Sequence, residues 1–348
     1  MYNTKAYAAY NSKDPLSPFE FDRRELRPAD VQIDILFCGV CHSDIHQVRD
    51  EWSGSIYPMV PGHEIVGKVI KTGEGVTKFK VGDTVGVGVF VDSCRTCKNC
   101  KSDHENYCVE GMTGTYNTME RDGVTISQGG YSTQIVVDER YVLSVSEKLD
   151  LKAVAPLLCA GITTYSPLRF VNVTKGTKVG VVGLGGLGHM GVKFASSFGA
   201  EVTMLSTSPR KEADAKKLGA HHFLLTTDEA QMKAKAGYFD VILNTISANH
   251  DYKQYLDLLD LNGKLLVVGL PSEQPKVDPF ALIKNRRSII GSMIGSIKET
   301  QEMLDYCAEK NIVAEIELIN MQEINEAYQR MIQGDVHYRF VIDLSSIK

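Results

Sequence analysis

Residues 178–188 read Lys178-Val179-Gly180-Val181-Val182-Gly183-Leu184-Gly185-Gly186-Leu187-Gly188, and this stretch decides the fold of the central part of the chain. The apolar start predicts a strand over Lys178–Val182, and the sequence that follows predicts a helix over Leu187–Phe198. Between them lies a G-x-G-x-x-G pattern. Its first glycine permits a tight turn, its second lets the backbone approach a pyrophosphate, and its third allows close helix–strand packing. The free N–H groups of the helix start also favour a phosphate. Glycine triplets often mark only a loop, but this context predicts a dinucleotide site formed by Gly183, Gly185, Gly186, Leu187 and Gly188.

Downstream of this turn, apolar segments alternate with helical ones, which is typical of a parallel, doubly wound α/β sheet of the Rossmann type. Further strands are expected at Glu201–Ser206, Val241–Thr245, Lys264–Gly269 and Ile289–Met293, and a helix at Pro209–Leu218. The first 150 residues read differently. Short apolar segments between Gly and Asp turns are typical of an irregular β-barrel. Its clearest strands are Val31–Phe37, Ile65–Lys71 and Thr84–Val89.

The end of the chain returns to the first pattern. Helices are expected near Thr300–Lys310 and Ile324–Ile332, followed by a strand over Tyr338–Ile342. We therefore predict two domains. Residues 1–150 and 290–348 form a mostly-β domain, which is interrupted by a Rossmann domain over residues 151–289.

The end of the second Rossmann strand predicts which dinucleotide binds. NAD-binding sheets carry an acidic residue there, about twenty residues after the glycines, that holds the adenine ribose hydroxyls. Here Glu201 lies at the opposite end of the strand. The strand instead ends in hydroxyl and basic side chains, which suit the 2′-phosphate of NADP(H); a solvated turn would look similar. The predicted phosphate contacts are Ser206, Thr207, Ser208, Arg210 and Lys211.

Composition narrows the class of protein. The 348 residues carry a formal net charge of −5, which gives no reason to expect nucleic acid or a membrane surface as a partner. No apolar stretch approaches the roughly eighteen residues of a membrane span, and the N-terminal residues lack the apolar core of a signal peptide. Cysteines that serve as metal ligands must stay reduced, so we expect a cytoplasmic protein.

Four cysteines follow a C-x2-C-x2-C-x7-C spacing, at Cys94, Cys97, Cys100 and Cys108. Four thiolates complete the tetrahedral shell of a structural zinc ion, and the short spacings let one loop wrap around it. Buried cysteines or two disulfides are the alternative, but spacing this dense favours zinc. A closed shell leaves no position for a reactant, so any reaction must take place elsewhere.

Three more candidate ligands lie far apart in the sequence, at Cys41, His63 and Cys159. Two cysteines and one histidine are a known ligand set for catalytic zinc, which keeps a fourth position open. Taken singly, each residue is more often part of a hydrophobic core. Six of the eight cysteines belong to these two sets and Cys38 lies near one of them, so only Cys307 stands clearly apart, and it receives no role.

Together with the four-cysteine loop, these residues give the chain its resemblance to the zinc-dependent medium-chain alcohol dehydrogenases. The resemblance runs from about Asp34 to the C-terminus, and Gly62-His63-Glu64-Ile65-Val66-Gly67 looks like the family's zinc signature. The segments Asp50-Glu51-Trp52 and Tyr57–Glu64 look like the cinnamyl-alcohol-dehydrogenase branch with its bacterial aldehyde reductases. The resemblance implies a GroES-like catalytic domain beside the Rossmann domain.

The resemblance also implies roles for single residues. Ser43 and His46 would form a proton relay, although both could simply lie at a helix start. Asp44 would hold the ring of His63, Glu64 would be a transient zinc ligand, and Arg339 would contact the pyrophosphate unless it is an ordinary surface residue. The expected walls of the substrate pocket, each of which could equally be core, are Trp52, Phe90 and Met293.

We therefore predict a homodimeric oxidoreductase with two zinc ions per chain that passes hydride between NADP(H) and a primary alcohol or aldehyde. It would mainly reduce aromatic and aliphatic aldehydes. The pairing strand of the dimer would be Ile289–Ile294. Three alternatives stay open: a non-catalytic zinc-stabilised binding protein on the same fold, an NAD-preferring alcohol dehydrogenase, and a member of the zinc-free quinone-reductase branch.

Overall fold

The computed structural model of the protein describes residues 2–347 and divides them into two compact units. The first unit contains the chain up to Cys159 and the segment from Gly295 onward, and the second is Ala160–Ile294. The chain thus leaves the first unit once and returns to it.

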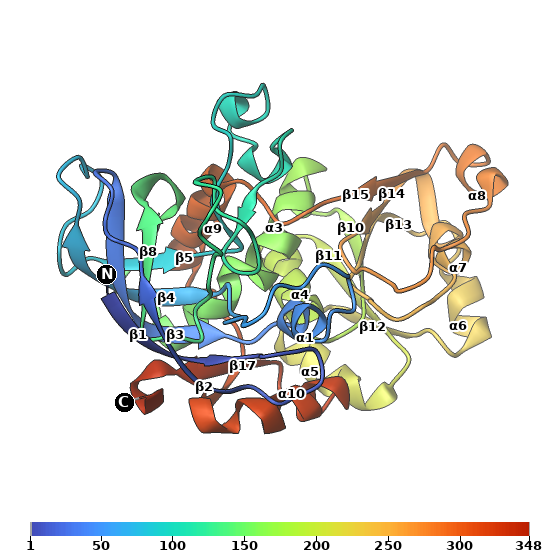
Figure 1. Cartoon of the computed structure of the whole chain (residues 1–348). Helices are drawn as coiled ribbons and strands as arrows, with labels where there is room; N and C mark the ends of the chain where they lie inside the picture. The colour runs from blue at the N-terminus through green and yellow to red at the C-terminus, as the bar shows by residue number, and fades with distance from the viewer. Residues whose placement is uncertain (1, 348) are drawn as a thin grey trace. The chain divides into compact units, whose positions relative to one another are not determined.

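The second unit is built on a six-stranded parallel sheet, whose strand order is β12-β11-β10-β13-β14-β15 (Figure 1). The first strand lies inside the sheet and the chain runs outward from it in both directions, which is the Rossmann order. Strands buried on both faces read as continuous apolar runs, and four of the five residues of β10 are buried. The strands are β10 (Lys178–Val182), β11 (Glu201–Ser206), β12 (His222–Leu225), β13 (Phe239–Asn244), β14 (Leu259–Val267) and β15 (Ser288–Gly291).

Six α-helices belong to this unit. Aromatic side chains join the first two of them, with the rings of Tyr165 and Phe194 5.3 Å apart. The core around β13 and β14 is apolar and includes Phe239, Ile242 and Leu265. The helices are α3 (Ala160–Phe170), α4 (Gly188–Ser197), α5 (Glu212–Lys217), α6 (Glu229–Ala234), α7 (Tyr252–Leu256) and α8 (Pro279–Ile283).

The first unit is mostly β, as expected. Its main sheet has the order β16-β17-β3-β4-β5-β9, with β8 also pairing with β3. All its pairings are antiparallel except that of β16 with β17. The strands are β3 (Asp30–Gly39), β4 (Ile65–Thr72), β5 (Thr84–Val87), β8 (Gln134–Asp138), β9 (Leu143–Ser144), β16 (Ile316–Asn320) and β17 (Arg339–Asp343).

Two hairpins and four α-helices complete this unit. The hairpin strands are β1 (Tyr2–Ala8) with β2 (Ser17–Arg23), and β6 (Phe90–Asp92) with β7 (Thr113–Gly114). The helices are α1 (His42–Val48), α2 (Leu151–Val154), α9 (Ile297–Lys310) and α10 (Ile324–Ile332). Short 3-10 helices join the elements; those near the cysteines are η1 (Cys100–Ser102), η2 (Glu105–Tyr107) and η4 (Ala155–Leu158).

Several elements differ from the sequence expectation, and in three of them the structure shows how. The helix expected over Pro209–Leu218 starts as a 3-10 turn, η5 (Pro209–Lys211), before α5. Helix α9 starts earlier than expected, because Ser296 and Glu299 form a capping box at its N-terminus. Strand β14 also starts earlier, because a register shift lets Leu259 pair with Phe239.

Candidate functional site

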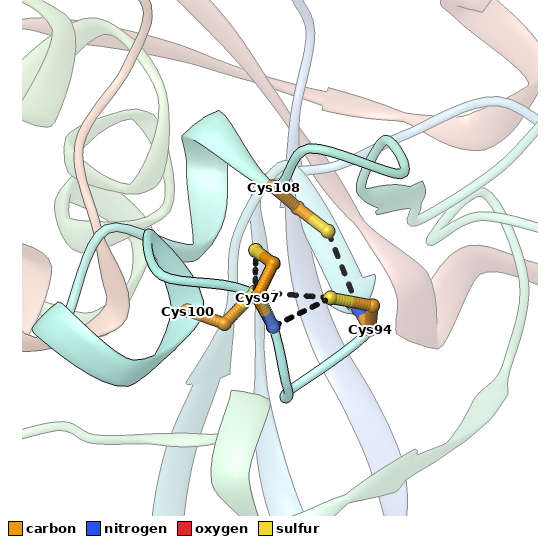
Figure 2. A group of neighbouring side chains, drawn as sticks. All are labelled: Cys94, Cys97, Cys100 and Cys108. Carbon is orange, nitrogen blue, oxygen red and sulfur yellow. Dashed lines mark hydrogen bonds between the residues drawn. The ribbon is translucent and has the colours of Figure 1, made fainter.

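The four cysteines of the C-x2-C-x2-C-x7-C run converge on one point (Figure 2). Their ligand atoms lie within 4.8 Å of one another. The Sγ atom of Cys100 is 3.8 Å from that of Cys94 and 3.5 Å from that of Cys97. A tetrahedral zinc ion with Zn–S bonds of about 2.3 Å would separate its sulfurs by about 3.8 Å. The donor set therefore fits zinc.

Backbone N–H groups prepare this loop for a cation. The N–H of Cys97 donates to the sulfur of Cys94 at 3.3 Å, and the N–H of Cys94 donates to that of Cys108 at 3.4 Å. Backbone donors at Cys100 and Val109 lower the pKa of Cys97 to about 6. Such donors favour thiolate, the form of cysteine that binds metal.

Side chains around the loop fasten it to the rest of the unit. The thiol of Cys100 donates to the hydroxyl of Ser93 at 3.2 Å, and that hydroxyl lies 2.8 Å from the hydroxyl of Tyr141. Arg95 forms ion pairs with Asp92 at 2.8 Å and with Asp138 at 3.1 Å. The loop is thus anchored by polar contacts at both its start and its interior.

A second cluster brings together residues that are distant in sequence. The ligand atoms of Cys41, His63, Glu64 and Cys159 lie within 4.8 Å of one another, and the two sulfurs are 3.9 Å apart. Cys41 immediately precedes α1, His63 and Glu64 immediately precede β4, and Cys159 follows η4. Three separate segments of the first unit therefore meet at this cluster, hereafter the mixed cluster.

Two atoms of the mixed cluster point to a missing partner. The Nε2 atom of His63 and the Oε2 atom of Glu64 are buried and find no hydrogen-bond partner among residues 2–347. Burying an unsatisfied polar atom is costly, so such atoms call for an explanation. A metal ion bound by the two sulfurs and the histidine would satisfy Nε2 directly. The residues therefore fit a zinc ion.

Asp44 holds this arrangement from behind. Its Oδ1 atom lies 3.1 Å from Nδ1 of His63 and accepts from the N–H of Gly62 at 3.2 Å, and its Oδ2 atom accepts from the N–H of Cys41 at 2.9 Å. A carboxylate on Nδ1 fixes the proton there and leaves Nε2 free for a metal. Asp44 was expected to hold the ring of His63, and it lies against that ring.

Three buried tyrosines surround Asp44, and the sequence analysis missed all of them. The hydroxyl of Tyr131 donates to Oδ2 of Asp44 at 3.2 Å, and Tyr328 donates to the hydroxyl of Tyr131 at 3.5 Å. The ring of Tyr116 stacks on that of His63 with centroids 5.9 Å apart. Burial raises the pKa of each of these phenols well above its ordinary value, so they stay protonated and can donate. No spacing in the sequence marks them.

Glu64 and Arg339 form a buried ion pair beside the mixed cluster. The Nη2 atom of Arg339, on β17, lies 2.5 Å from Oε1 of Glu64 and donates to the carbonyl of Val40 at 2.8 Å. Burial raises the pKa of Glu64 to about 7, and the charge of Arg339 opposes that rise. The alternative of an ordinary surface arginine is wrong, because Arg339 is only 5% exposed and compensates a buried carboxylate. Its contact with a pyrophosphate stays a prediction.

The expected relay residues lie on the first turns of α1. The hydroxyl of Ser43 is 3.6 Å from the sulfur of Cys41. The Nδ1 atom of His46 lies 2.5 Å from Oε2 of Glu51, and its ring stacks on that of Trp52 with centroids 5.0 Å apart. Glu51 belongs to the segment Asp50-Glu51-Trp52 and was not predicted as a site residue. An acidic residue just after a helix that carries a histidine was the signal available.

The three predicted pocket residues have different surroundings. Trp52 is 42% exposed beside His46, whereas Phe90 is only 3% exposed and packs edge-on against Tyr141. Phe90 thus occupies the core of the first unit close to the four-cysteine loop. Met293 belongs to the second unit and is 43% exposed.

In the second unit, the glycine turn has the form that its pattern requires. Gly183 has φ +89°, a backbone conformation that favours glycine. A Cβ atom on Gly188 would lie 1.8 Å from the carbonyl oxygen of Gly183, so a side chain there would separate helix from strand. A Cβ atom on Gly185 would meet nothing within 4 Å, which leaves space beside the backbone for a ligand. The turn therefore fits a pyrophosphate.

The end of β11 lies next to this turn. Val182 pairs with Leu205, so the chain reaches Gly183 and Ser206 at the same edge of the sheet. The ammonium group of Lys211 donates to the carbonyl of Leu184 at 2.6 Å, which brings this cation to the glycine turn. Ser206 accepts a hydrogen bond from the N–H of Ser208 at 3.2 Å, while Thr207 and Arg210 are exposed.

Glu201 lies at the opposite end of β11, as the sequence implied. Its carboxylate accepts from the hydroxyl of Tyr238 at 2.7 Å and lies 2.8 Å from Nε2 of His222. It is therefore engaged away from the glycine turn, and the strand end near that turn offers hydroxyl and basic groups.

Comparison with known proteins shows the family of the chain. The family described as alcohol dehydrogenase GroES-like domain matches residues 27–147, and the family described as zinc-binding dehydrogenase matches residues 186–309. An NADP-dependent alcohol dehydrogenase C of Mycolicibacterium smegmatis is 55% identical over all of both chains. The aldehyde reductase YahK of Escherichia coli is 54% identical over 97% of each. The structure of a cinnamyl alcohol dehydrogenase from Sorghum bicolor is 46% identical, with a TM-score of 0.97 over 99% of both chains.

Proposed function

The chain belongs to the zinc-dependent medium-chain alcohol dehydrogenase family, and we propose that it is an NADP(H)-dependent member that mainly reduces aldehydes. The family that the sequence analysis named is thereby confirmed, as is the combination of a GroES-like domain with a Rossmann sheet. The protein is an oxidoreductase. The alternatives of a non-catalytic binding protein and of an NAD-preferring enzyme find no support in its relatives.

The observation that carries the proposal is the mixed cluster. Cys41, His63 and Cys159 would hold a catalytic zinc ion, and Glu64 would serve as a transient ligand because its Oε2 atom is buried without a partner beside them. When bound, zinc would supply a Lewis acid for a carbonyl oxygen, and NADPH would supply the hydride. The four-cysteine cluster would hold a second zinc ion with a structural role only.

The residues of α1 would deliver the proton that aldehyde reduction consumes. Ser43 lies beside the ligand Cys41, and its hydroxyl can pass a proton because it both donates and accepts. His46 would supply the proton from the side of solvent, since its side chain is 30% exposed. Glu51 would hold the ring of His46 in place through its contact with Nδ1.

NADP(H) binding would fall to the second unit. The support is the space at Gly185, the position of Lys211 and the hydroxyl-rich end of β11 at the same sheet edge. We propose that the nucleotide-binding domain, expected over residues 151–289, is the second unit, and that the catalytic domain, expected over residues 1–150 with 290–348, is the first unit, which contains Cys159. The 2′-phosphate contacts proposed are Ser206, Thr207, Ser208, Arg210 and Lys211.

Substrate class, assembly and location are finer proposals. Trp52 is exposed beside His46, where its ring suits contact with an aromatic or aliphatic aldehyde. Phe90 is buried and is therefore a weaker candidate for a wall of the substrate pocket. A homodimer would pair the edge strand β15 of one sheet with that of its partner, over Ile289–Ile294. The two proposed zinc sites need six cysteines as thiolates, which supports a reducing compartment such as the cytoplasm. Among residues 2–347, no helix has both the length and the apolar character needed to cross a membrane.

Cofactor oxidation at 340 nm with benzaldehyde tests the proposal. NADPH should support turnover with at least about a hundredfold higher kcat/KM than NADH, because each charge-assisted bond to the 2′-phosphate contributes about 1.5–3 kcal/mol. Ser206→Asp should reverse much of this preference by placing a carboxylate against the phosphate. Glu201→Gln, at the opposite end of the same strand, is the matched control and should keep it. Equal efficiency of the wild type with both cofactors would refute the NADP(H) assignment.

A further inference from the structure

Asp44 joins the mixed cluster to the interior of the first unit. Its side chain is fully buried, and two of its hydrogen bonds come from the backbone at Cys41 and Gly62, a ligand and the neighbour of a ligand. A third reaches the ring of His63. The orientation of this one carboxylate therefore sets the position of two metal-binding segments at once.

Tyr131 is a side-chain donor to the other oxygen of this carboxylate. Its hydroxyl donates to Oδ2 at 3.2 Å, and its backbone N–H donates to the carbonyl of Pro61 at 2.9 Å. The ring lies against Gly62, where a Cβ atom would meet Tyr131 Cδ1 at 2.6 Å. The residue preceding His63 is thus packed on the same ring whose hydroxyl holds Asp44.

A second phenol extends this contact to the C-terminal part of the chain. Tyr328 lies on α10 and donates to the hydroxyl of Tyr131 at 3.5 Å, and both residues are buried. The hydroxyls therefore form a directed series from Tyr328 through Tyr131 to Asp44. A phenol that receives a hydrogen bond becomes a better donor, so the series strengthens its last bond.

We propose that Tyr131 is a positioning residue for the catalytic metal and acts on His63 through Asp44, with Tyr328 reinforcing it from α10. The inference rests on the catalytic zinc of the proposed function. Without the phenol, Oδ2 loses a donor in a dry environment, and the carboxylate is less firmly held opposite Nδ1 of His63. Mutating the hydrogen-bond partner of a metal-ligating histidine typically weakens metal binding by about 10–100-fold. Asp44 is such a partner, and Tyr131 is one hydrogen bond further from the metal.

The proposal predicts an order among conservative variants. Tyr131→Phe keeps the ring against Gly62 and should weaken binding of the catalytic zinc by about tenfold, at the low end of that range. Tyr328→Phe should weaken it less. The double variant should equal Tyr131→Phe, because Tyr328 has its effect only through the hydroxyl of Tyr131. Tyr255→Phe removes a buried phenol hydroxyl from the second unit and should change nothing.

Zinc retention by the holoenzyme tests this order without any turnover. Each variant is equilibrated with graded EDTA, and the zinc left on the chain is counted by mass spectrometry. The variant Cys159→Ala, which should show only the structural zinc, identifies which of the two release steps belongs to the mixed cluster. In Tyr131→Phe, this step should move to about tenfold lower EDTA while the other stays in place. An unchanged step in Tyr131→Phe would overturn the proposal.

A spectroscopic readout separates positioning from general destabilisation. Cobalt placed at the mixed cluster should show a shifted visible band in Tyr131→Phe at a temperature where the protein is fully folded, and an unshifted band in Tyr255→Phe. An identical cobalt band in Tyr131→Phe and wild type would contradict the proposal. Should Tyr131→Phe fail to fold, Tyr328→Phe carries the same test, and identical retention and spectra there would overturn it. A wild type with only one zinc would instead refute the proposed function.

Discussion

The two metal clusters of the first unit are built on opposite plans. The four-cysteine cluster comes from fifteen consecutive residues, Cys94 to Cys108, and needs only its own loop to form. The mixed cluster joins Cys41 to Cys159, 118 residues further along the chain, with His63 between them. A local cluster can be recognised from spacing, whereas an assembled cluster exists only once the fold has formed around it.

The clusters also differ in whether their ligand atoms already have hydrogen-bond partners. In the loop, all four donors are sulfurs, and backbone N–H groups already support their negative charge. In the mixed cluster, a histidine nitrogen and a carboxylate oxygen are buried and have no hydrogen-bond partner in the described part of the chain, and a buried carboxylate and tyrosines lie behind them. The first arrangement is closed and suits a structural ion. The mixed cluster leaves room for a further ligand and suits a catalytic ion.

Removing a ligand of the mixed cluster should have the largest effect. Cys159→Ala should lower kcat/KM for benzaldehyde with NADPH by at least about a thousandfold, because zinc supplies several kcal/mol of transition-state stabilisation. The thermal midpoint should stay close to that of the wild type. Cys307→Ala is the matched control, since Cys307 is a buried cysteine of α9 outside both clusters. Turnover within tenfold of the wild type would show that the mixed cluster is not the reactive site.

Removing a ligand of the four-cysteine cluster should act on stability instead. Cys94→Ser should lower the free energy of unfolding by several kcal/mol, because the binding energy of a structural zinc ion is part of the folding energy. Denaturant unfolding at fixed zinc concentration measures this loss. Any folded fraction should keep a normal KM for the aldehyde. A variant that is both as stable and as active as the wild type would mean that the loop holds no structural zinc.

Glu51→Gln sharpens the contrast by weakening the reactive site without touching a metal ligand. The neutral amide can still contact His46, but an uncharged contact is weaker than the carboxylate–imidazole one, so the ring is held less firmly and kcat should fall by about tenfold or more. KM and zinc content should not change. Glu51→Asp, which keeps the charge, should recover part of the loss. A wild-type kcat and pH profile in Glu51→Gln would remove Glu51 from the relay.

Among these variants, Tyr141→Phe should have the smallest effect. It should change stability and leave activity as it is. It removes the hydroxyl that lies 2.8 Å from that of Ser93, which in turn lies 3.2 Å from the sulfur of Cys100. The free energy of unfolding should fall by about 1 kcal/mol, the usual contribution of one hydrogen bond, and kcat should stay the same. A large loss of activity with unchanged stability would show that Tyr141 supports the mixed cluster and not the four-cysteine cluster.

The same contrast explains how much the sequence could predict. Strands β10 and β11 and helix α10 were predicted at their observed bounds, since apolar periodicity is local information. Helix α3 was missed, and it continues through Pro167 in a fully packed environment. The tyrosines behind Asp44 were missed for a related reason. Tyr131 and Tyr328 reach Asp44 only through tertiary packing, and a tyrosine in the sequence reads as an ordinary core residue.

The zinc content of three purified proteins tests the central claim most directly, which is that the chain binds two zinc ions in clusters with separate roles. Mass spectrometry of metal and protein should give two zinc ions per chain in the wild type and one each in Cys94→Ser and Cys159→Ala. Cys159→Ala should keep the structural zinc and be stable but inactive. Cys94→Ser should keep the catalytic zinc, and the fraction of it that is folded should be active. A single zinc ion in the wild type, or loss of the same ion from both variants, would contradict this account.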